Sequence, residues 1–294
     1  MLSVENLSKK IENQQVLDHV SFTIKKGSIT ALLGRNGVGK TTLLQTIVGI
    51  LDADTGKVLY NDQSIQANPG LKQDIVFIPD SNALFKNYSV KEIISFYDMI
   101  YPNFNQKKLF ELLNKFNLPQ QGMFRSFSKG TRAMFFIAVS FSTQAKVIIL
   151  DEPTNGLDPI IKKQMLQHVI EEVAENDIAL LLSTHHLNEV ETIADHVLFM
   201  KEGRIAEQVS LEELNQRMKK IQIAFKEVHL LQITNLKGVK LLQQSGRVLT
   251  LLLAQDTANA MEILESMNPI LLEELPLTLE DLFVHTLGGE LDVV

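Results

Sequence analysis

The chain has no cysteine, and that absence removes several kinds of chemistry at once. Disulfide bonds, thiolate metal sites and a catalytic thiol are all excluded. Long hydrophobic runs are lacking too: the longest, such as 197–200 and 248–254, fall far short of the ~20 residues of a membrane span. The first residues hold no basic segment followed by an apolar run, so no secretory signal is expected. We therefore expect a soluble chain.

Positive charge is also scarce. The 294 residues include 28 lysines and arginines against 35 aspartates and glutamates, a net charge of −7. This balance argues against nucleic acid as the main partner. The histidines show no metal-ligand spacing, so no zinc site is expected. What the chain does have is 45% hydrophobic residues, enough for the core of one large domain and a small one.

A glycine-rich segment carries the strongest signal. Gly34, Gly39, Lys40 and Thr41 form the pattern Gly-x-x-x-x-Gly-Lys-[Ser/Thr], with a further glycine at Gly37. Glycines allow successive backbone N–H groups to point at one anion, and the following helix adds unpaired donors and partial positive charge. Lysine adds a full charge, and the threonine hydroxyl can bind Mg²⁺. The predicted nucleotide triphosphate site comprises Gly34, Asn36, Gly37, Val38, Gly39, Lys40, Thr41 and Thr42.

Two unbroken apolar runs indicate parallel strands that are covered on both faces. They span 147–150 and 179–182, and the segment from Ile160 to Ala174 between them has the pattern of a helix. The first run ends in Asp151 and Glu152, at the strand end where ligands bind in open parallel sheets. We expect Asp151 to hold Mg²⁺ through water and Glu152 to act as general base on an attacking water.

Other segments complete the expected organisation. Strands are predicted before the glycine-rich loop, in 2–6, 16–24 and 29–33, and near 57–62 and 76–78 after it. Helical spacing runs from Val90 to about Asn117, with a break near Pro102. Its aromatic cluster of Phe96, Tyr97, Tyr101 and Phe104 fits either core packing or a groove for a partner helix.

The character of the sequence changes after Gly203. A capping pattern (Ser210, Glu213) predicts a helix over 210–220, followed by a strand near 221–225 and a hairpin across Ser245 and Gly246. A helix near 257–267 and a last segment, 277–286, follow. No phosphate or catalytic pattern recurs there.

The order of these motifs resembles the ATP-binding subunits of ABC transporters over residues 1–208. Ser128, Lys129 and Gly130 stand at the family's Leu-Ser-Gly-Gly-Gln signature. Asp158 matches its aspartate loop, and His185, after Ser183 and Thr184, its switch histidine. The resemblance implies that Glu152, His185 and Lys40 are catalytic. It also implies that the signature contacts ATP held by a second subunit, with Asp158 in the loop between subunits.

Several residues depart from the family pattern. Ile11 stands where an aromatic residue usually stacks on adenine, so weaker affinity and base selectivity are expected. Asp80 replaces the glutamine that follows the family's proline, and its carboxylate can still meet Mg²⁺. Lys129 replaces a glycine and adds positive charge near the facing phosphate.

The resemblance sets the expected fold, domains and partners. The fold is α/β, a P-loop NTPase core of the ABC type with a mixed sheet and flanking helices. The ATPase domain spans 1–216, with a helical subdomain at about 86–140, and an accessory α/β domain spans 217–294. Expected ligands are ATP and Mg²⁺. Expected partners are separate transmembrane permease subunits and a second cassette, identical or different, at the cytoplasmic face of the cell membrane.

The lysine at the signature and the C-terminal extension resemble bacterial exporters of drugs, lipids and antimicrobial peptides more than importers. Two rival functions stay open on the sequence: a non-transport ABC ATPase in DNA maintenance or translation, and a nucleotide-gated regulator without useful turnover. The first usually carries a long coiled coil or two cassettes, and neither is present. Intact Lys40, Glu152 and His185 argue against the second.

Overall fold

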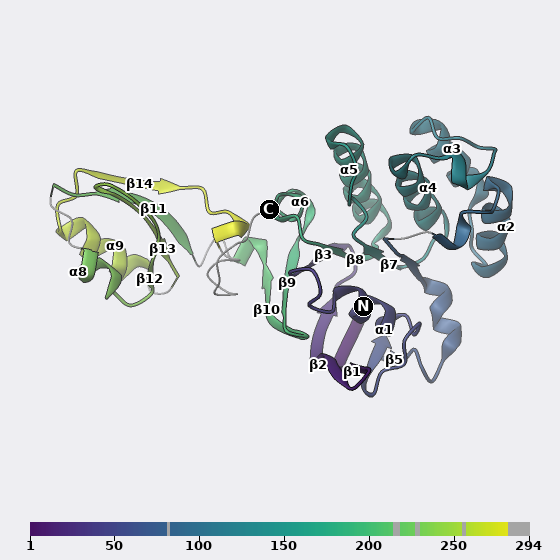
Figure 1. The fold of residues 1–294 in the computed structure, drawn as a ribbon, viewed down its shortest axis with the longest axis horizontal. Coiled ribbons are helices and arrows are strands. Elements are labelled where there is room, and N and C mark those ends of the chain that lie inside the picture. Colours follow the sequence, from purple (N-terminus) through teal and green to yellow (C-terminus); the bar gives the residue numbers. More distant parts are fainter. Residues whose placement is uncertain (81–82, 214–217, 227–229, 255–256, 282–294) are drawn as a thin grey trace. The chain divides into compact units, whose positions relative to one another are not determined.

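Two compact units make up the chain, Met1–Gln208 and Val209–Val294 (Figure 1). The computed structural model describes residues 1–80, 83–213, 218–226, 230–254 and 257–281. The domain boundary predicted from the sequence falls between residues 216 and 217, and both of these lie outside the described residues.

A six-stranded sheet forms the centre of the first unit, in the order β10-β9-β3-β8-β7-β6. Strands β9, β3, β8, β7 and β6 run parallel, and every residue of β3, β7 and β8 is buried. Burial on both faces explains their unbroken apolar runs and confirms those predicted strands. The strands are β3 (Ser28–Leu33), β6 (Ile75–Ile78), β7 (Val147–Asp151), β8 (Ala179–Thr184), β9 (His196–Lys201) and β10 (Arg204–Ser210).

A second, antiparallel sheet packs against the first, in the order β2-β1-β4-β5. Between the sheets lies helix α1 (Lys40–Ile47), which buries Leu43 and Leu44 in one core with Leu32 of β3 and Ile149 of β7. This core fixes the glycine-rich loop, because the loop joins β3 directly to α1. The strands are β1 (Leu2–Ile11), β2 (Gln14–Ile24), β4 (Thr55–Tyr60) and β5 (Gln63–Ser64).

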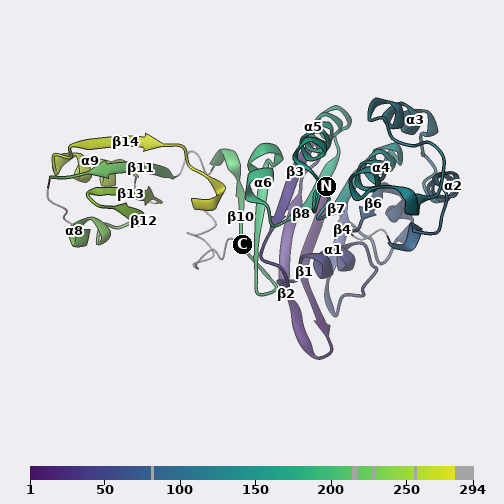
Figure 2. The ribbon, with the colours of Figure 1, turned by 45° about the horizontal axis from the view of Figure 1, so that its top comes forward.

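Helices cover the opposite face of the parallel sheet. In Figures 1 and 2, α5 (Pro159–Asn176) and α6 (Leu187–Ile193) lie across the sheet from α1. Helix α5 begins at Pro159, where a proline costs no hydrogen bond. It confirms the helix predicted between the two buried strands. The layered α/β core with a parallel sheet is the fold that the sequence predicted.

A helical subdomain forms one end of the unit (Figure 1). Ser89 and Glu92 close a capping box at the start of α2, and the chain breaks at Pro102 as expected. Tyr97 packs in the core and stacks on Tyr101, whereas Phe96 is exposed at the surface. The subdomain consists of α2 (Val90–Ile100), α3 (Gln106–Lys115) and α4 (Lys129–Ser142), with short 3-10 turns at Ala83–Phe85 and Phe124–Ser126; a further 3-10 turn, Pro69–Asp74, leads into β6.

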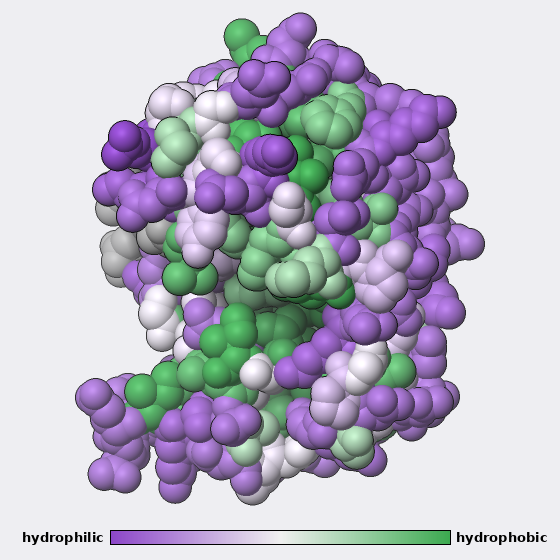
Figure 3. Space-filling model, turned by 90° about the vertical axis from the view of Figure 1, so that its right-hand side faces the viewer, coloured by the Kyte–Doolittle hydropathy of each residue, from purple (hydrophilic) through white to green (hydrophobic). Residues whose placement is uncertain are grey.

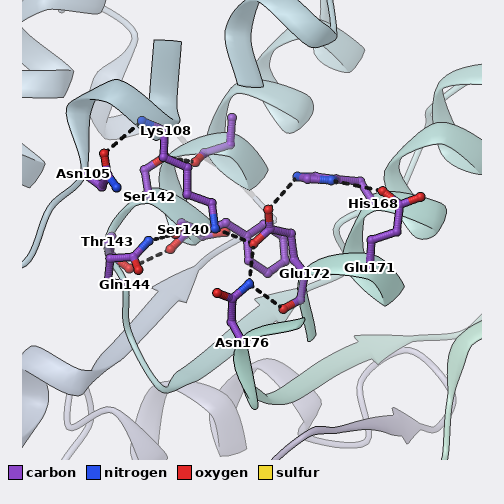
Figure 4. A network of polar contacts seen from close by, with 12 residues as sticks. Asn105, Lys108, Ser140, Ser142, Thr143, Gln144, His168, Glu171, Glu172 and Asn176 are labelled. Carbon is purple, nitrogen blue, oxygen red and sulfur yellow. Dashed lines mark hydrogen bonds and ion pairs between the residues drawn. The ribbon is translucent and has the colours of Figure 1, made fainter. Parts of the chain in front are cut away.

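Polar contacts join this subdomain to α5, as Figure 4 shows. Lys108 of α3 places Nζ 2.6 Å from Oε2 of Glu172, and Lys115 Nζ lies 3.3 Å from Glu171 Oε2. His168 of α5 is buried beside the rings of Phe116 and Phe141. Burial, together with the charge of nearby Lys115, lowers the pKa of His168 to about 4, so the ring is neutral at pH 7.

The second unit is a four-stranded antiparallel sheet with helices, in the order β12-β13-β11-β14. Its chain order, β-α-β-β-α-β, is that of ferredoxin-like folds. Ile221, Ile223, Leu249, Leu251 and Leu264 form its core. The elements are β11 (Lys219–Ala224), α8 (Leu230–Thr234), β12 (Val239–Ser245), β13 (Val248–Leu253), α9 (Thr257–Ser266) and β14 (Leu271–Leu275).

One predicted element of the second unit is wrong in part. The sequence predicts a helix over 210–220, but Lys219 and Lys220 belong to strand β11, where Lys220 pairs with Leu252 and Leu275. The capping pattern is local, whereas these strand pairs form with residues far along the chain and override it. The predicted hairpin and the helix near 257–267 are confirmed. Of the segment 277–286, residues 282–286 lie outside the described residues.

Candidate functional site

The glycine-rich loop turns sharply between β3 and α1. Gly37 and Gly39 have φ values of 83° and 106°, in the left-handed region that favours glycine. A Cβ at Gly34 would lie 2.7 Å from the carbonyl oxygen of Met200, so no side chain fits there. Helix α1 begins at Lys40, which leaves the N–H groups of its first turn without helical partners. The strand, loop and helix predicted for a phosphate site are all present.

Lys40 is held in place by two kinds of contact. Its side chain is buried, and Nζ donates to the carbonyl oxygen of Gly34 over 2.8 Å. Nζ also lies 3.3 Å from Oε1 of Glu152, at the end of β7. The motif lysine and the predicted general base therefore meet, although 112 positions separate Lys40 from Glu152 in the chain (152 − 40).

Asp151 accepts two hydrogen bonds at the end of β7. Thr41 Oγ1 donates to Asp151 Oδ2 over 2.8 Å, and Ser183 Oγ donates to Asp151 Oδ1 over 2.5 Å. Burial raises the pKa of Asp151, and the charges of Glu152 and Asp80 add to the rise, while the two hydrogen bonds oppose it. A hydroxyl and a carboxylate at this distance are ligands that suit Mg²⁺.

Glu152 and His185 face each other across two neighbouring strand ends. His185 Nδ1 lies 2.9 Å from Glu152 Oε2. Glu152 has a φ of 46°, an uncommon backbone conformation for a non-glycine residue, and its N–H donates to Ser183. With Lys40 on Oε1 and His185 on Oε2, both carboxylate oxygens are oriented.

A pocket of about 300 Å³ brings these side chains together. Asp80 lines it, as does Asn155, which sequence reasoning did not select. Ile11 is not among the lining residues: it lies at the end of β1, 40% exposed, while Val16 of the paired strand β2 reaches the pocket. The lining is formed by Val16, Asn36, Gly37, Gly39, Lys40, Thr41, Thr42, Asp80, Glu152, Asn155 and His185.

The predicted signature begins helix α4. Ser128 caps this helix, since its Oγ accepts from the N–H of Thr131 over 3.1 Å. A Cβ at Gly130 would lie 2.9 Å from Ile161 Cδ1, so α4 and α5 approach closely there. Lys129 Nζ lies against Gly156 of its own chain. Neither Ser128 nor Gly130 lines the pocket at the phosphate loop.

Asp158, the predicted residue of the loop between subunits, caps helix α5. Its Oδ1 accepts from the N–H groups of Ile160 and Ile161 over 3.0 and 3.1 Å. These two hydrogen bonds fix the start of helix α5, directly after the loop that follows Glu152.

Sequence reasoning missed a buried carboxylate behind the site. Glu189 of α6 is 5% exposed and accepts from Thr154 Oγ1 over 2.5 Å. Thr184 Oγ1 donates to the same oxygen, Oε2, over 3.4 Å, and the other oxygen, Oε1, lies 2.6 Å from Lys162 Nζ. It therefore ties the loop after Glu152 to the residue before His185. A glutamate in the first turn of a short helix after a buried strand is the only sequence signal for it.

Comparison with known proteins assigns this chain to a family. The family model for ABC transporters matches residues 17–155. The ABC transporter ATP-binding protein YtrB of Bacillus subtilis (strain 168) is 34% identical over 290 residues, 99% of each chain. The chain belongs to the ATP-binding subunits of ABC transporters. As such it is an ATPase of the P-loop type.

Two further relatives agree with this assignment. The lantibiotic transport ATP-binding protein SrtF of Streptococcus pyogenes is 32% identical, over 70% of this chain and 89% of its own. A solved structure of the ATP binding subunit of an ABC transporter superposes with a TM-score of 0.67 and 28% identity, covering 74% of this chain and 92% of the other. The likeness to YtrB includes the second unit, whereas these two match the smaller share expected for the first.

The subunit powers a membrane transporter, as its family does. Among the residues that the structure describes, no helix is long and apolar enough to cross a bilayer.

Proposed function

We propose that this ABC subunit drives export, of antimicrobial peptides or similar amphipathic compounds, from the cytoplasmic face of the cell membrane. Its likeness to SrtF, a lantibiotic transport protein, supports the substrate class. The observation that carries the catalytic part is the contact of Glu152 with both Lys40 and His185 in one pocket beside the phosphate loop.

In the proposed hydrolysis, Glu152 is the general base. It follows buried Asp151 at the strand end, and water placed beside its carboxylate can lose a proton as it attacks the γ-phosphate. His185 Nδ1 binds Glu152, which orients the ring so that Nε2 is available to the phosphate. Lys40 and the loop N–H groups stabilise the charge that develops on the phosphate oxygens.

Mg²⁺ fits between Thr41 and Asp151. Their oxygens are 2.8 Å apart and near the phosphate loop, and Asp80 lines the same pocket. Among the described residues, no group of three acidic, histidine or cysteine side chains could hold a metal ion alone. We assign Mg²⁺ to Thr41 and to Asp151, with water and nucleotide phosphates as its other ligands. Bound there, it neutralises charge on the phosphates.

The signature acts on nucleotide held by a second copy of the chain. Ser128 Oγ accepts from the Thr131 N–H as helix cap and lies 2.8 Å from Thr131 Oγ1; when the Thr131 hydroxyl donates in that pair, the Ser128 hydroxyl can donate to a phosphate. The first turn of α4 adds free N–H groups and the positive end of a helix dipole. In a head-to-tail dimer of identical chains, the phosphate loop of each chain faces the signature of the other, so two complete sites form. A heterodimer with a different cassette is the alternative.

A hydrophobic face of the helical subdomain is the proposed contact with the membrane subunit. Figure 3 shows hydrophobic residues gathered around a hollow on this side of the molecule. Leu84, Tyr88, Phe96, Met99 and Ile100 are exposed large hydrophobic residues from this part of the chain. Apolar groups in one area of a surface are typical of interaction sites.

Export is tested in membrane vesicles. Inside-out and right-side-out vesicles are prepared from cells that make this chain and the membrane protein encoded beside it. We expect ATP-dependent accumulation of a labelled cationic peptide in inside-out vesicles only, and none with Lys40→Ala. Accumulation in right-side-out vesicles would establish an importer. ATP hydrolysis without movement in either preparation would favour a non-transport ATPase.

A further inference from the structure

A second cavity adjoins the nucleotide pocket within the first unit. It has a volume of about 450 Å³ and shares Asp80, Glu152 and Asn155 with that pocket. The shared residues form a wall with the phosphate loop on one side and helix α4 on the other. The remaining lining is formed by Ile78, Pro79, Lys86, Lys129, Arg132, Ala133, Ile137, Asp151 and Pro153.

The cavity holds three cationic side chains: Lys86, Lys129 and Arg132. Among the described residues, none of the three forms an ion pair with a carboxylate. Two of the three carboxylates that line the cavity are bound elsewhere: Asp151 accepts from Thr41 and Ser183, and Glu152 contacts Lys40 and His185. Asp80 is the third, so three cations face one carboxylate that is not already engaged, and the balance of charge in the cavity favours an anion.

Arg132 is fixed in position. Its Nη2 donates to the carbonyl oxygen of Arg125 over 2.7 Å, and its guanidinium lies 5.4 Å from the ring centre of Phe124. Its Nε is buried and has no hydrogen-bond partner. A buried donor without a partner costs free energy, which an anion in the cavity would recover. One turn earlier on the same helix, Lys129 Nζ lies against Gly156.

We propose that this cavity receives the inorganic phosphate that ATP hydrolysis produces. The proposal rests on hydrolysis beside Glu152, which stands in both pockets. A tetrahedral oxyanion takes the room of a few water molecules, each about 30 Å³, so it fits. Phosphate can then leave on the α4 side while ADP is still bound at the loop. Arg132 and Lys129 bind its oxygens, and Lys86 stands at the exposed rim.

Phosphate binding is measured without turnover. The full chain is saturated with ADP and Mg²⁺, so that the phosphate loop is occupied, and inorganic phosphate is titrated while its ³¹P line width is recorded. Lys86→Gln removes one cation of the cavity, and Lys86→Gln combined with Arg132→Gln removes two. Lys91→Gln is the matched control, because this exposed lysine of α2 removes the same charge from the same subdomain but does not line the cavity.

We expect phosphate affinity to fall about threefold in Lys86→Gln, as for an exposed ion pair, and about tenfold in the double variant. Lys91→Gln should match the wild type, and ADP affinity should be unchanged in all three. Wild-type phosphate affinity in the double variant would overturn the proposal. An equal loss of ADP affinity and phosphate affinity would also overturn the proposal, because it would indicate general damage to the protein. No step of this titration requires ATP hydrolysis. A chain that fails to hydrolyse ATP would therefore contradict the proposed ATPase mechanism but would leave the phosphate-binding result unchanged.

Discussion

The two units of this chain differ in what they bury. The first buries charged side chains, with Lys40, Asp151 and Glu189 each less than a tenth exposed. The second has an apolar core, and Thr250 is the one buried polar side chain among its described residues. Burying charge costs free energy unless partners and hydrogen bonds compensate. For Lys40 and Asp151 the compensating partners include residues of the proposed nucleotide site, whereas Glu189 is compensated behind it by Lys162 and two threonines.

Because of this difference, substitutions of charged residues should have different effects in the two units. A carboxylate removed from the first unit leaves a partner uncompensated in the active site, whereas an exposed carboxylate of the second unit leaves only water-exposed neighbours. Paired variants, one in each unit, therefore separate chemistry from general effects of charge.

The largest effect is expected from Glu152→Gln. The amide keeps the shape but cannot accept a proton, so turnover should fall about 10²–10⁴-fold with ATP affinity retained. Glu273→Gln, on exposed β14 of the second unit, is the matched control and should hydrolyse ATP as the wild type does. Phosphate release and equilibrium ATP binding are measured for both. Normal turnover in Glu152→Gln would remove Glu152 from the role of base.

Acid should weaken the first unit selectively. His168 is buried and neutral, with its pKa near 4, whereas an exposed histidine has a pKa near 6.5. Unfolding therefore takes up a proton between these values. The contribution is fully present above pH 6.5 and is lost as the pH falls towards 4, by about 3 kcal/mol in total.

The groups around His168 are Glu171 and Glu172 of α5 and Lys108 and Lys115 of α3. His168→Phe removes the titration between two aromatic neighbours and should flatten the slope. Hydrogen exchange at pH 7 and pH 5, corrected for intrinsic rates, compares both units in one sample. Equal acid weakening of wild type and His168→Phe would contradict the assignment.

A smaller effect is expected at Glu189, which positions two catalytic loops without touching nucleotide. Glu189→Ala should lower kcat about tenfold and leave the KM for ATP nearly unchanged, because the loops of Glu152 and His185 lose a common anchor. Glu189→Gln still accepts from Thr154 and should recover part of the rate. Glu274→Ala, which breaks the exposed pair with Lys219, is the control. A rise in KM with kcat unchanged would assign Glu189 to nucleotide binding instead.

The sequence predicted the first unit well because its motifs are local and carry chemistry. The phosphate loop needs glycines at fixed positions, and Asp151 and Glu152 end a strand whose apolar run is unmistakable. Such signals depend on a few neighbouring residues, so they can be recognised in the sequence before the rest of the fold is known. The same holds for the helix break near Pro102.

Long-range contacts explain what the sequence did not reveal. Ser183 meets Asp151 only because β7 and β8 pair in that register, and Glu189 reaches Thr154 only because α6 packs beside α5. In the second unit, Lys219 and Lys220 join a strand through residues more than thirty positions away (252 − 220 = 32). Helical residues 211–213 do follow Ser210, as the capping pattern predicts, but the predicted end of that helix was wrong because Lys219 and Lys220 pair with distant strands.

Closure of two identical chains on ATP is tested most directly by light scattering of the full-length Glu152→Gln chain. The phosphate loop and the signature stand in separate parts of one unit, so each needs a second copy to complete it. With ATP and Mg²⁺ the molar mass should double, and with ADP it should stay that of one chain. Ser128→Arg in the same background should bind ATP and stay monomeric. A Glu152→Gln chain that stays monomeric at saturating ATP would contradict the homodimer.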